Sequence, residues 1–196
     1  MAHISSIGAA MFSDLSIAMP ATAPTFSTLD TAAEFQALFA TAINSVGGTP
    51  AANTFVRVGN ARSFPAIGTP ANVVKVPVYG QKISSSIQGQ ADAPQLEVDI
   101  NFVATEWDRV NTCLLGSAVG NGVQYVMRFT LLNTEPTGIG ATKYASTAAG
   151  VGSVENSQYY WIGKIESLLV TPSLTDATVA KLAMSLQSDF FGPYTV

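Results

Sequence analysis

Two carboxylates, Glu97 and Asp99, come nearest to a catalytic pair in this chain of 196 residues. Paired carboxylates can act as general acid and base, as in glycoside hydrolysis, when they face each other across a cleft. These two lie two positions apart in an alternating segment, so a strand would carry them side by side on one ridge. The pair therefore predicts a negatively charged surface and not an active site.

The other residues that could support chemistry form no constellation. His3 is the only histidine and lies at the N-terminus, which argues against a histidine base or a histidine-based metal cluster. Segment 138–143 contains glycines and a lysine but lacks the spacing of a phosphate-binding loop. Cys113 is the single cysteine, so an internal disulfide is excluded, and we expect it to be a small buried residue of a helix. We expect no enzyme activity, no metal and no cofactor.

The composition indicates a protein whose surface is covered by copies of itself. Only 11% of the residues are charged and 47% are hydrophobic, whereas about 25% are charged in an average soluble protein. No apolar run approaches the roughly 18 residues of a membrane-spanning helix, and the first 20 residues lack the basic start of a secretory signal. A net charge of −4 and scattered basic residues argue against binding of nucleic acid through its phosphates. An obligate assembly explains these features best, because permanent interfaces are large and poor in charge.

The two carboxylates belong to the clearest strand pattern in the chain, residues 95–102. Its apolar side chains alternate with polar ones, so the strand would have a dry face and a wet, acidic face made of Gln95, Glu97, Asp99 and Asn101. The period then changes, and Trp107, Val110 and Leu114 predict a helix over about 105–118 with Thr105 and Asp108 as a weak capping box. A second alternating strand begins at Val123. The pattern predicts a sheet with one small helix packed across it.

The remaining elements complete a mainly β, antiparallel protein with a single domain over 1–196. Thr31 and Glu34 form a capping box at the start of an apolar stripe that predicts a second helix over about 31–46. Pro77 cannot donate to a ladder, so the strand at 73–79 is an edge strand or one whose partner ends there. The other expected elements are strands at 11–19, 55–58, 159–170 and 178–188, a hairpin with a polar tip at 80–94, and a long loop at 136–157.

The order of several segments resembles the tail tube (major tail) proteins of long-tailed bacteriophages. These segments are VVKVPVYGQKISSSIQGQ at 73–90, LEVDINFV at 96–103, the helix opening at 104–107, VQYVMRFTLL at 123–132, and the closing strands at 160–165 and 177–187. The resemblance covers about residues 55–190, which makes residues 1–54 an N-terminal extension of the core. The helix at 31–46 and the loop at 136–157 look longer than the minimal core of the family.

The resemblance implies a fold, a function and a set of partners. The fold would be a β-sandwich or barrel-like tail tube fold with one flanking helix, and the protein would be a structural component of the virion tail, assembled in the host cytoplasm. Stacked hexameric rings would form a tube that conducts DNA, without specific DNA binding and without membrane contact. Partners would be the chain itself and the tail terminator, tail tip and tape-measure proteins. The lumen would be lined by Gln95, Glu97, Asp99 and Asn101.

Two loops are expected to contact neighbouring subunits or rings, because their small and polar residues have little to bury alone. The residues concerned are Gln81, Lys82, Ser84, Ser85, Ser86, Gln88, Gly138, Gly140, Lys143 and Tyr144. Two alternatives remain open: the inner tube of a contractile injection or type VI secretion device, and a β-barrel module that binds a small apolar ligand. The second alternative requires a cavity lined by inward-facing apolar side chains.

Overall fold

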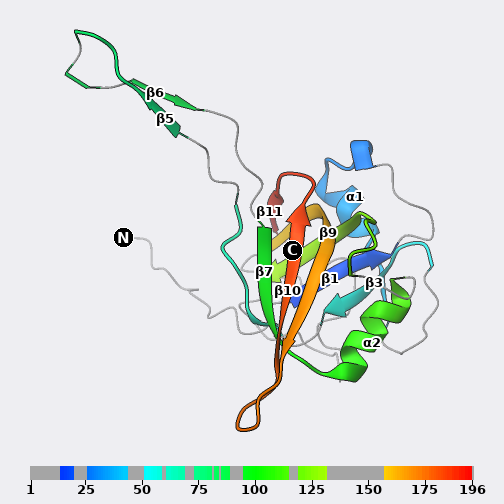
Figure 1. Ribbon diagram of the computed structural model, residues 1–196. Helices are drawn as coiled ribbons and strands as arrows, with labels where there is room; N and C mark the ends of the chain where they lie inside the picture. Colours follow the sequence, from blue (N-terminus) through cyan, green and yellow to red (C-terminus); the bar gives the residue numbers. More distant parts are fainter. Residues whose placement is uncertain are drawn as a thin grey trace, which may run out of the picture.

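A long, rolled antiparallel sheet forms the body of the protein. The computed structural model describes residues 14–19, 26–43, 51–58, 61–68, 73–80, 82–83, 85–88, 95–114, 119–131 and 157–195. Within these residues nine strands form one sheet in the order β2-β3-β1-β8-β9-β10-β7-β4, with β11 paired to β9 (Figure 1). All of these pairings are antiparallel except the one between β2 and β3. The expected mainly β, antiparallel class is therefore confirmed.

The bounds of the elements are as follows. The strands of the sheet are β1 (Asp14–Met19), β2 (Thr41–Ala42), β3 (Thr54–Val58), β4 (Ala61–Ser63), β7 (Gln95–Asn101), β8 (Tyr125–Leu131), β9 (Ser157–Thr171), β10 (Val179–Leu186) and β11 (Phe191–Thr195). A separate hairpin is made by β5 (Val73–Val76) and β6 (Ser85–Gln88). The helices are α1 (Ala32–Ala37), α2 (Ala104–Cys113) and a short 3-10 turn at Phe26–Thr28.

The sheet rolls up because strands from both of its ends bury side chains in one core. Val56 and Val58 of β3 share this cluster with Val98 and Ile100 of β7, although the two strands lie far apart in the strand order. Helix α2 closes the roll by packing Val110 and Cys113 against the same cluster. This arrangement agrees with the expected barrel-like fold with one flanking helix. The buried Cys113 agrees with its expected role.

A second, smaller core lies on the other face of the sheet, under α1. Phe35 and Phe39 from this segment pack on Phe55 of β3 and Tyr160 of β9. The rings of Phe35 and Tyr160 stack with their centroids 5.0 Å apart. Because α1 covers this part of the sheet, β1 is buried at every position and β8 at all but its last. The alternation in β8 therefore does not separate a dry face from a wet one.

The two helices differ from their sequence predictions in their ends and caps. At α1 the capping box is confirmed, since the Glu34 amide donates to Thr31 and the Glu34 carboxylate accepts from the Thr31 amide. The predicted helix at 31–46 is nevertheless too long: α1 ends at Ala37, and Thr41–Ala42 instead pairs in parallel with β3. The amides of Ala40 and Thr41 both donate to the Asn53 carbonyl, which draws the backbone out of the helical path.

Helix α2 has no capping box. Its N-cap is Val103, which makes no side-chain cap hydrogen bond, so the predicted role of Thr105 and Asp108 is wrong. Residues 44–46 of the first predicted helix and 115–118 of the second lie outside the described residues.

The hairpin of β5 and β6 extends away from the rolled sheet (Figure 1). Val73 pairs with Gln88 and Val76 with Ser85, so β5 ends directly before Pro77, which has no amide hydrogen to donate. The hairpin predicted at 80–94 is formed instead by residues 73–76 and 85–88, and its turn carries apolar residues beside the exposed Lys82: Tyr79 is 106% exposed and Ile83 is 81% exposed. We call the described residues from 73 to 88 the arm.

Gly163 lies at a close approach between β9 and β10. A Cβ atom there would lie 2.8 Å from the backbone oxygen of Ser185 and 3.3 Å from atoms of the Trp161 side chain. Gly163 is paired with Leu186 in β10 and Tyr125 in β8, so the backbone has strands on both sides and cannot easily move. A side chain at this position would separate the strands that carry both cores.

Replacement Gly163→Ala should therefore lower the free energy of unfolding by roughly 1–3 kcal/mol, the usual cost of forcing a methyl group into a packed region. Urea unfolding followed by circular dichroism measures this loss. Thr171→Ala, an exposed position at the end of the same strand, serves as the control and should change stability by less than about 0.5 kcal/mol. Equal stabilities for Gly163→Ala and the wild type would contradict the close approach.

Candidate functional site

The outward face of β7 carries the polar side chains that the sequence predicts. Leu96, Val98 and Ile100 are buried in the core, whereas Gln95, Glu97 and Asn101 are exposed and Asp99 is partly exposed. The predicted alternation over this strand is confirmed at each position. We call this face, together with the outward residues of the adjoining β10 and of the C-terminal half of β9, the polar wall.

The polar wall is of mixed charge and not simply acidic. Lys181 of β10 donates its Nζ to Oε2 of Glu97 at 2.9 Å, and this hydrogen bond and charge raise the pKa of Lys181. Ser63 of β4 donates to Asp99 Oδ2 at 2.9 Å. Lys181 thus adds a positive charge to the face that the sequence predicts to be acidic. The sequence does not reveal this, because β10 is distant from β7 in the chain and lies beside it only after folding. Leu169 of β9 lies opposite Lys181 on the same face and is 63% exposed, so the wall is polar over β7 and carries a large apolar side chain on β9.

The same wall continues onto β9. Ser185 of β10 donates to the exposed Glu166, and Lys164 lies directly opposite Ser185 in the strand register. Residues opposite each other in an antiparallel pair share a face of the sheet. Glu97 and Asp99 each have a partner of their own, and they lie on one ridge, as the spacing predicts. The geometry offers no facing pair of carboxylates for acid and base catalysis.

Two strand edges are open on either side of this wall, within the part of the chain that the structure describes. The edge of β9 opposite β10 pairs with β8 only as far as Gly163, and Ile165 then accepts a hydrogen bond from Gly120. From Glu166 to Thr171 no described strand pairs with that edge. On the far side, β4 pairs with β7 only at Asp99 and Ile100, which leaves residues 95–98 without a described partner there. The wall is therefore a three-stranded surface, β9-β10-β7, with unpaired backbone at both margins.

The residues expected to contact neighbouring subunits are only partly described. Lys82 and Ser86 are exposed on the arm, and Ser85 and Gln88 lie in β6. Gln81, Ser84, Gly138, Gly140, Lys143 and Tyr144 lie outside the described residues. Their role in contacts between subunits stays a prediction.

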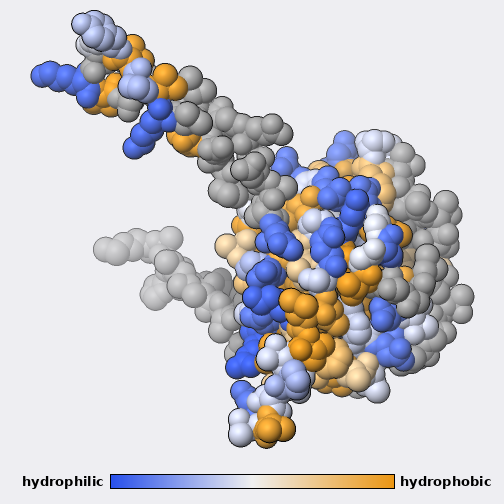
Figure 2. All heavy atoms as spheres, viewed as in Figure 1, coloured by the Kyte–Doolittle hydropathy of each residue, from blue (hydrophilic) through white to orange (hydrophobic). Residues whose placement is uncertain are grey.

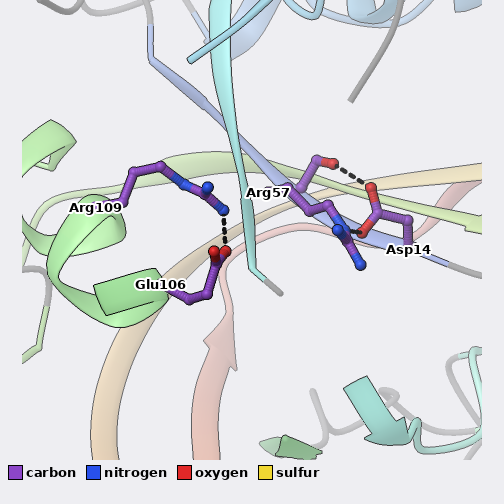
Figure 3. Close-up of polar contacts among 5 residues, drawn as sticks. Asp14, Arg57, Glu106 and Arg109 are labelled. Atoms are coloured by element: carbon purple, nitrogen blue, oxygen red, sulfur yellow. Dashed lines mark hydrogen bonds and ion pairs between the residues drawn. The ribbon is translucent and has the colours of Figure 1, made fainter. Parts of the chain in front are cut away.

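A buried polar cluster lies on the covered face of the sheet, and the sequence analysis missed it. Arg57 of β3 donates its Nε to Asp14 Oδ1 at 2.8 Å, and Ser16 donates to Asp14 Oδ2 at 3.2 Å. Figure 3 shows this group, together with the separate pair of Glu106 and Arg109 on α2. Burial raises the pKa of Asp14 to about 6, although Arg57 and Arg128 both act to lower it. The cost of removing this carboxylate from water exceeds the attraction of its two cations.

Arg128 completes the cluster from β8. It is only 3% exposed, and its guanidinium carbon lies 4.5 Å from the centroid of the Phe39 ring and 4.8 Å from that of Phe55. Burial lowers the pKa of Arg128. The aromatic faces compensate part of the lost hydration by cation–π attraction. This contact fixes the segment after α1 against the sheet. The only signal in the sequence is an arginine in an otherwise apolar strand.

The described residues contain no group of three metal-ligating side chains. None of the helices within the described ranges is long and apolar enough to span a membrane.

No protein-family model matches this chain, and no curated protein matches its sequence. Solved structures similar to this chain include the tail of an empty gene transfer agent particle refined with C6 symmetry. The TM-score is 0.45 and the sequence identity is 12%, and the match covers 76% of this chain and 90% of that chain. A chain from the virion of a native gene transfer agent particle has a TM-score of 0.45 and 12% identity, and the match covers 70% of this chain and 87% of that chain. A chain of the SPP1 tail tube has a TM-score of 0.35 and 12% identity, and the match covers 67% of this chain and 66% of that chain.

Replacement Asp14→Asn should change how stability depends on pH. The folded protein holds the Asp14 proton more tightly than the unfolded chain, whose carboxyl has an ordinary pKa of 3.8. The contribution of Asp14 to stability therefore falls as the pH rises from about 4 to about 6, and it is constant above that. The fall is on the order of 3 kcal/mol, because each pKa unit corresponds to about 1.4 kcal/mol.

Urea unfolding of the wild type and of Asp14→Asn at a series of pH values measures this contribution. The stability of the wild type relative to the variant should decrease between pH 4 and 6. Asp189→Asn, at an exposed position, is the control and should keep a constant difference. A wild type that gains stability over Asp14→Asn across this interval would contradict the account.

Proposed function

We propose that this chain is a structural subunit that assembles through its strand edges into stacked hexameric rings, which form a tail tube for the passage of DNA. The observation that carries the proposal is the polar wall, which is exposed and bounded on both sides by strand edges that no described strand pairs with. The resemblance of the sequence to tail tube proteins gives the wall its role. A catalytic function has no support in the geometry of Glu97 and Asp99.

Open strand edges favour self-association because their free amides and carbonyls can pair with another chain. Soluble proteins usually protect such edges with charges, bulges or covering segments. Here the edge of β9 from 166 to 171 contains one charged residue, Glu166, and the exposed apolar residues Leu169 and Val170. Joining this edge to β7 of a neighbour would continue the sheet from one subunit to the next. A closed ring would leave no free edge.

The low charge content supports the same assembly. With only 11% charged residues, the chain has too few charges to keep an isolated surface well hydrated. The exposed apolar side chains are concentrated on the arm and around the end of the β9–β10 hairpin, as the coloured surface in Figure 2 shows. Burial of these positions between subunits would remove that surface from water.

In this assembly the polar wall would face the lumen, with Gln95, Glu97, Asp99 and Asn101 as its lining. Phosphate groups of DNA would meet carboxylates and amides, and Lys181 would be held by Glu97. A lining with three carboxylates, Glu97, Asp99 and Glu166, against two lysines would bind DNA weakly, as passage requires. The resemblance also implies contacts with tail terminator, tail tip and tape-measure proteins, and a place in the virion tail.

The interior of the roll is filled with side chains, which disfavours the alternative of a β-barrel that binds a ligand. Trp161, Met127 and Leu182 lie in the core and are each 0% exposed. The inner tube of a contractile injection or secretion device would use the same wall and the same edges.

The purified protein should polymerise in a manner that depends on concentration. Open edges and low charge make the isolated subunit prone to association, so rings or tubes should appear as the concentration rises into the micromolar range. Size-exclusion chromatography with light scattering, followed by negative-stain microscopy, measures this. A stable monomer at tens of micromolar in ordinary salt would contradict the proposal.

A double replacement in the polar wall, Glu97→Lys with Asp99→Lys, should leave assembly intact but create DNA retention. Side chains that face a wide aqueous channel are screened over about 8 Å at physiological salt, so tubes should still form. The new lysines would bind phosphates, and salt should release the DNA. Binding of short duplex DNA to pelleted tubes at 50 and 200 mM salt measures this.

The neutral double variant, Glu97→Gln with Asp99→Asn, serves as the matched control. It releases Lys181 from Glu97 but adds no cation, so it should retain far less DNA than the lysine variant. Failure of the lysine variant to assemble would show that the wall is buried in an interface, contrary to the proposed lumen.

A further inference from the structure

The segment between α2 and β8 contains the only Asn-Gly pair of the chain, Asn121 and Gly122. In such a pair the backbone nitrogen of the glycine can attack the side-chain amide of the asparagine, because glycine has no side chain to hinder the approach. Gly122 has a φ of +73°, and apart from its chain neighbours no heavy atom lies within 4 Å of where a Cβ would be. The turn therefore meets the elementary requirements for cyclisation of an asparagine onto its own backbone.

One hydrogen bond holds the side-chain oxygen of Asn121 against the backbone of this turn. The Val123 amide donates to Asn121 Oδ1 at 2.9 Å. Because this bond spans Gly122, it folds the side-chain amide back along the Gly122 peptide, the usual form of a turn in which asparagine accepts from the residue two positions on. A donor on this oxygen also stabilises the negative charge that develops there when the side-chain carbon is attacked.

A second hydrogen bond joins the side-chain nitrogen of Asn121 to Tyr125. Asn121 Nδ2 donates to the Tyr125 hydroxyl at 2.8 Å. Tyr125 is the first residue of β8 and is only 7% exposed, so its ring is fixed in the main core. Burial raises the pKa of Tyr125, although the bond from Asn121 acts to lower it, and the hydroxyl keeps its proton at neutral pH. A proton donor therefore lies beside the nitrogen that must leave as ammonia.

We propose that Asn121 is a site of self-modification, at which the fold assists loss of the side-chain amide. The Gly122 nitrogen gives its proton to a solvent base and bonds to Asn121 Cγ, and the bond between Cγ and Nδ2 breaks. The leaving nitrogen takes the Tyr125 proton and departs as ammonia, and the tyrosine recovers a proton from water. Water reaches the exposed turn and opens the cyclic imide to aspartate or to isoaspartate.

The modified turn lies beside the strand edge on which the proposed assembly depends. The Gly120 amide donates to the Ile165 carbonyl at 2.9 Å, directly before the segment 166–171 that no described strand pairs with. Conversion of Asn121 places a negative charge at the start of this edge, which already carries Glu166, and isoaspartate also lengthens the backbone of the turn. This consequence rests on the proposed function: subunits that convert before assembly should join their neighbours less well, because charge protects a strand edge from pairing.

Peptide mapping by mass spectrometry tests the modification itself. The purified full chain is incubated near neutral pH at physiological temperature, and samples are digested at intervals. Asn121 should lose its amide progressively, with both aspartate and isoaspartate as products. Asn101, which is also exposed but is followed by Phe102, is the internal control and should keep its amide in the same digests. An Asn121 amide that stays intact over several weeks would overturn the proposal.

Replacement Tyr125→Phe separates assistance by the fold from the reactivity of the Asn-Gly sequence, because it keeps the buried ring and removes only the hydroxyl. Conversion should slow by at least about fivefold, less than the roughly 10²–10⁴-fold typical of general acid catalysis, because water can partly replace the hydroxyl at this exposed turn. An unchanged rate would show that the sequence alone sets the reaction, and a faster rate that the hydrogen bond protects Asn121. Either result would overturn the proposal. Gly122→Ala should also slow conversion, since its methyl group hinders the attacking nitrogen, and a wild-type rate there would exclude the imide route.

The consequence for assembly is tested separately with Asn121→Asp, which carries the product charge from the start. Its critical concentration for polymers should be several-fold higher than that of the wild type. Gln187→Glu, an exposed amide-to-acid change outside the turn, is the matched control and should assemble as the wild type does. Normal assembly of Asn121→Asp would overturn the link to the strand edge. A wild type that loses the Asn121 amide but forms no polymer would refute the proposed function and still support the modification site.

Discussion

The pairing of β9 with three other strands is the interaction on which the rest of the structure depends. This strand is 15 residues long, and it holds β8 along one edge and β10 and β11 along the other. Its neighbouring residues Tyr160 and Trp161 are completely buried on opposite faces, one in each core. Gly163 follows them because no side chain fits between the strands there. Both cores are thus positioned by one stretch of backbone.

The second half of β9 has a different environment, and the proposed function follows from that difference. Helix α1 and its aromatic residues cover the sheet over the first half of β9, so polar groups there, such as Asp14 and Arg128, are buried. Beyond the cover, the outward face becomes the polar wall, and no described strand pairs with the edge of β9 from Glu166 onward. A covered half supplies stability and an uncovered half supplies surfaces for assembly. One continuous strand gives both halves a fixed relative orientation.

The sequence predicts the elements that obey a simple periodicity. The alternation at Gln95–Asn101 predicts β7 and its two faces correctly, because one face is buried and the other is open. Helix α2 also begins near its predicted start. Where tertiary contacts override the local pattern, the predictions fail. The helix predicted after Thr31 gives way to a strand, because the Asn53 carbonyl accepts hydrogen bonds from two backbone amides. The face predicted to be acidic is partly neutralised, because Lys181 pairs with Glu97 from a strand about 80 residues away in the chain.

The buried cluster around Asp14 and the short strands β4 and β11, of three and five residues, are not predicted, since single charged residues in apolar segments and short strands are common without such roles.

The orientation of the polar wall in an assembled polymer decides whether the wall lines a channel. A helical reconstruction by cryo-electron microscopy of polymers grown from the purified chain would show the wall at side-chain level. The account predicts that Glu97 and Asp99 face an axial channel and that the free edge of β9 pairs with a neighbouring subunit. Carboxylates that point to the outside of the polymer, or that are buried between layers, would contradict it.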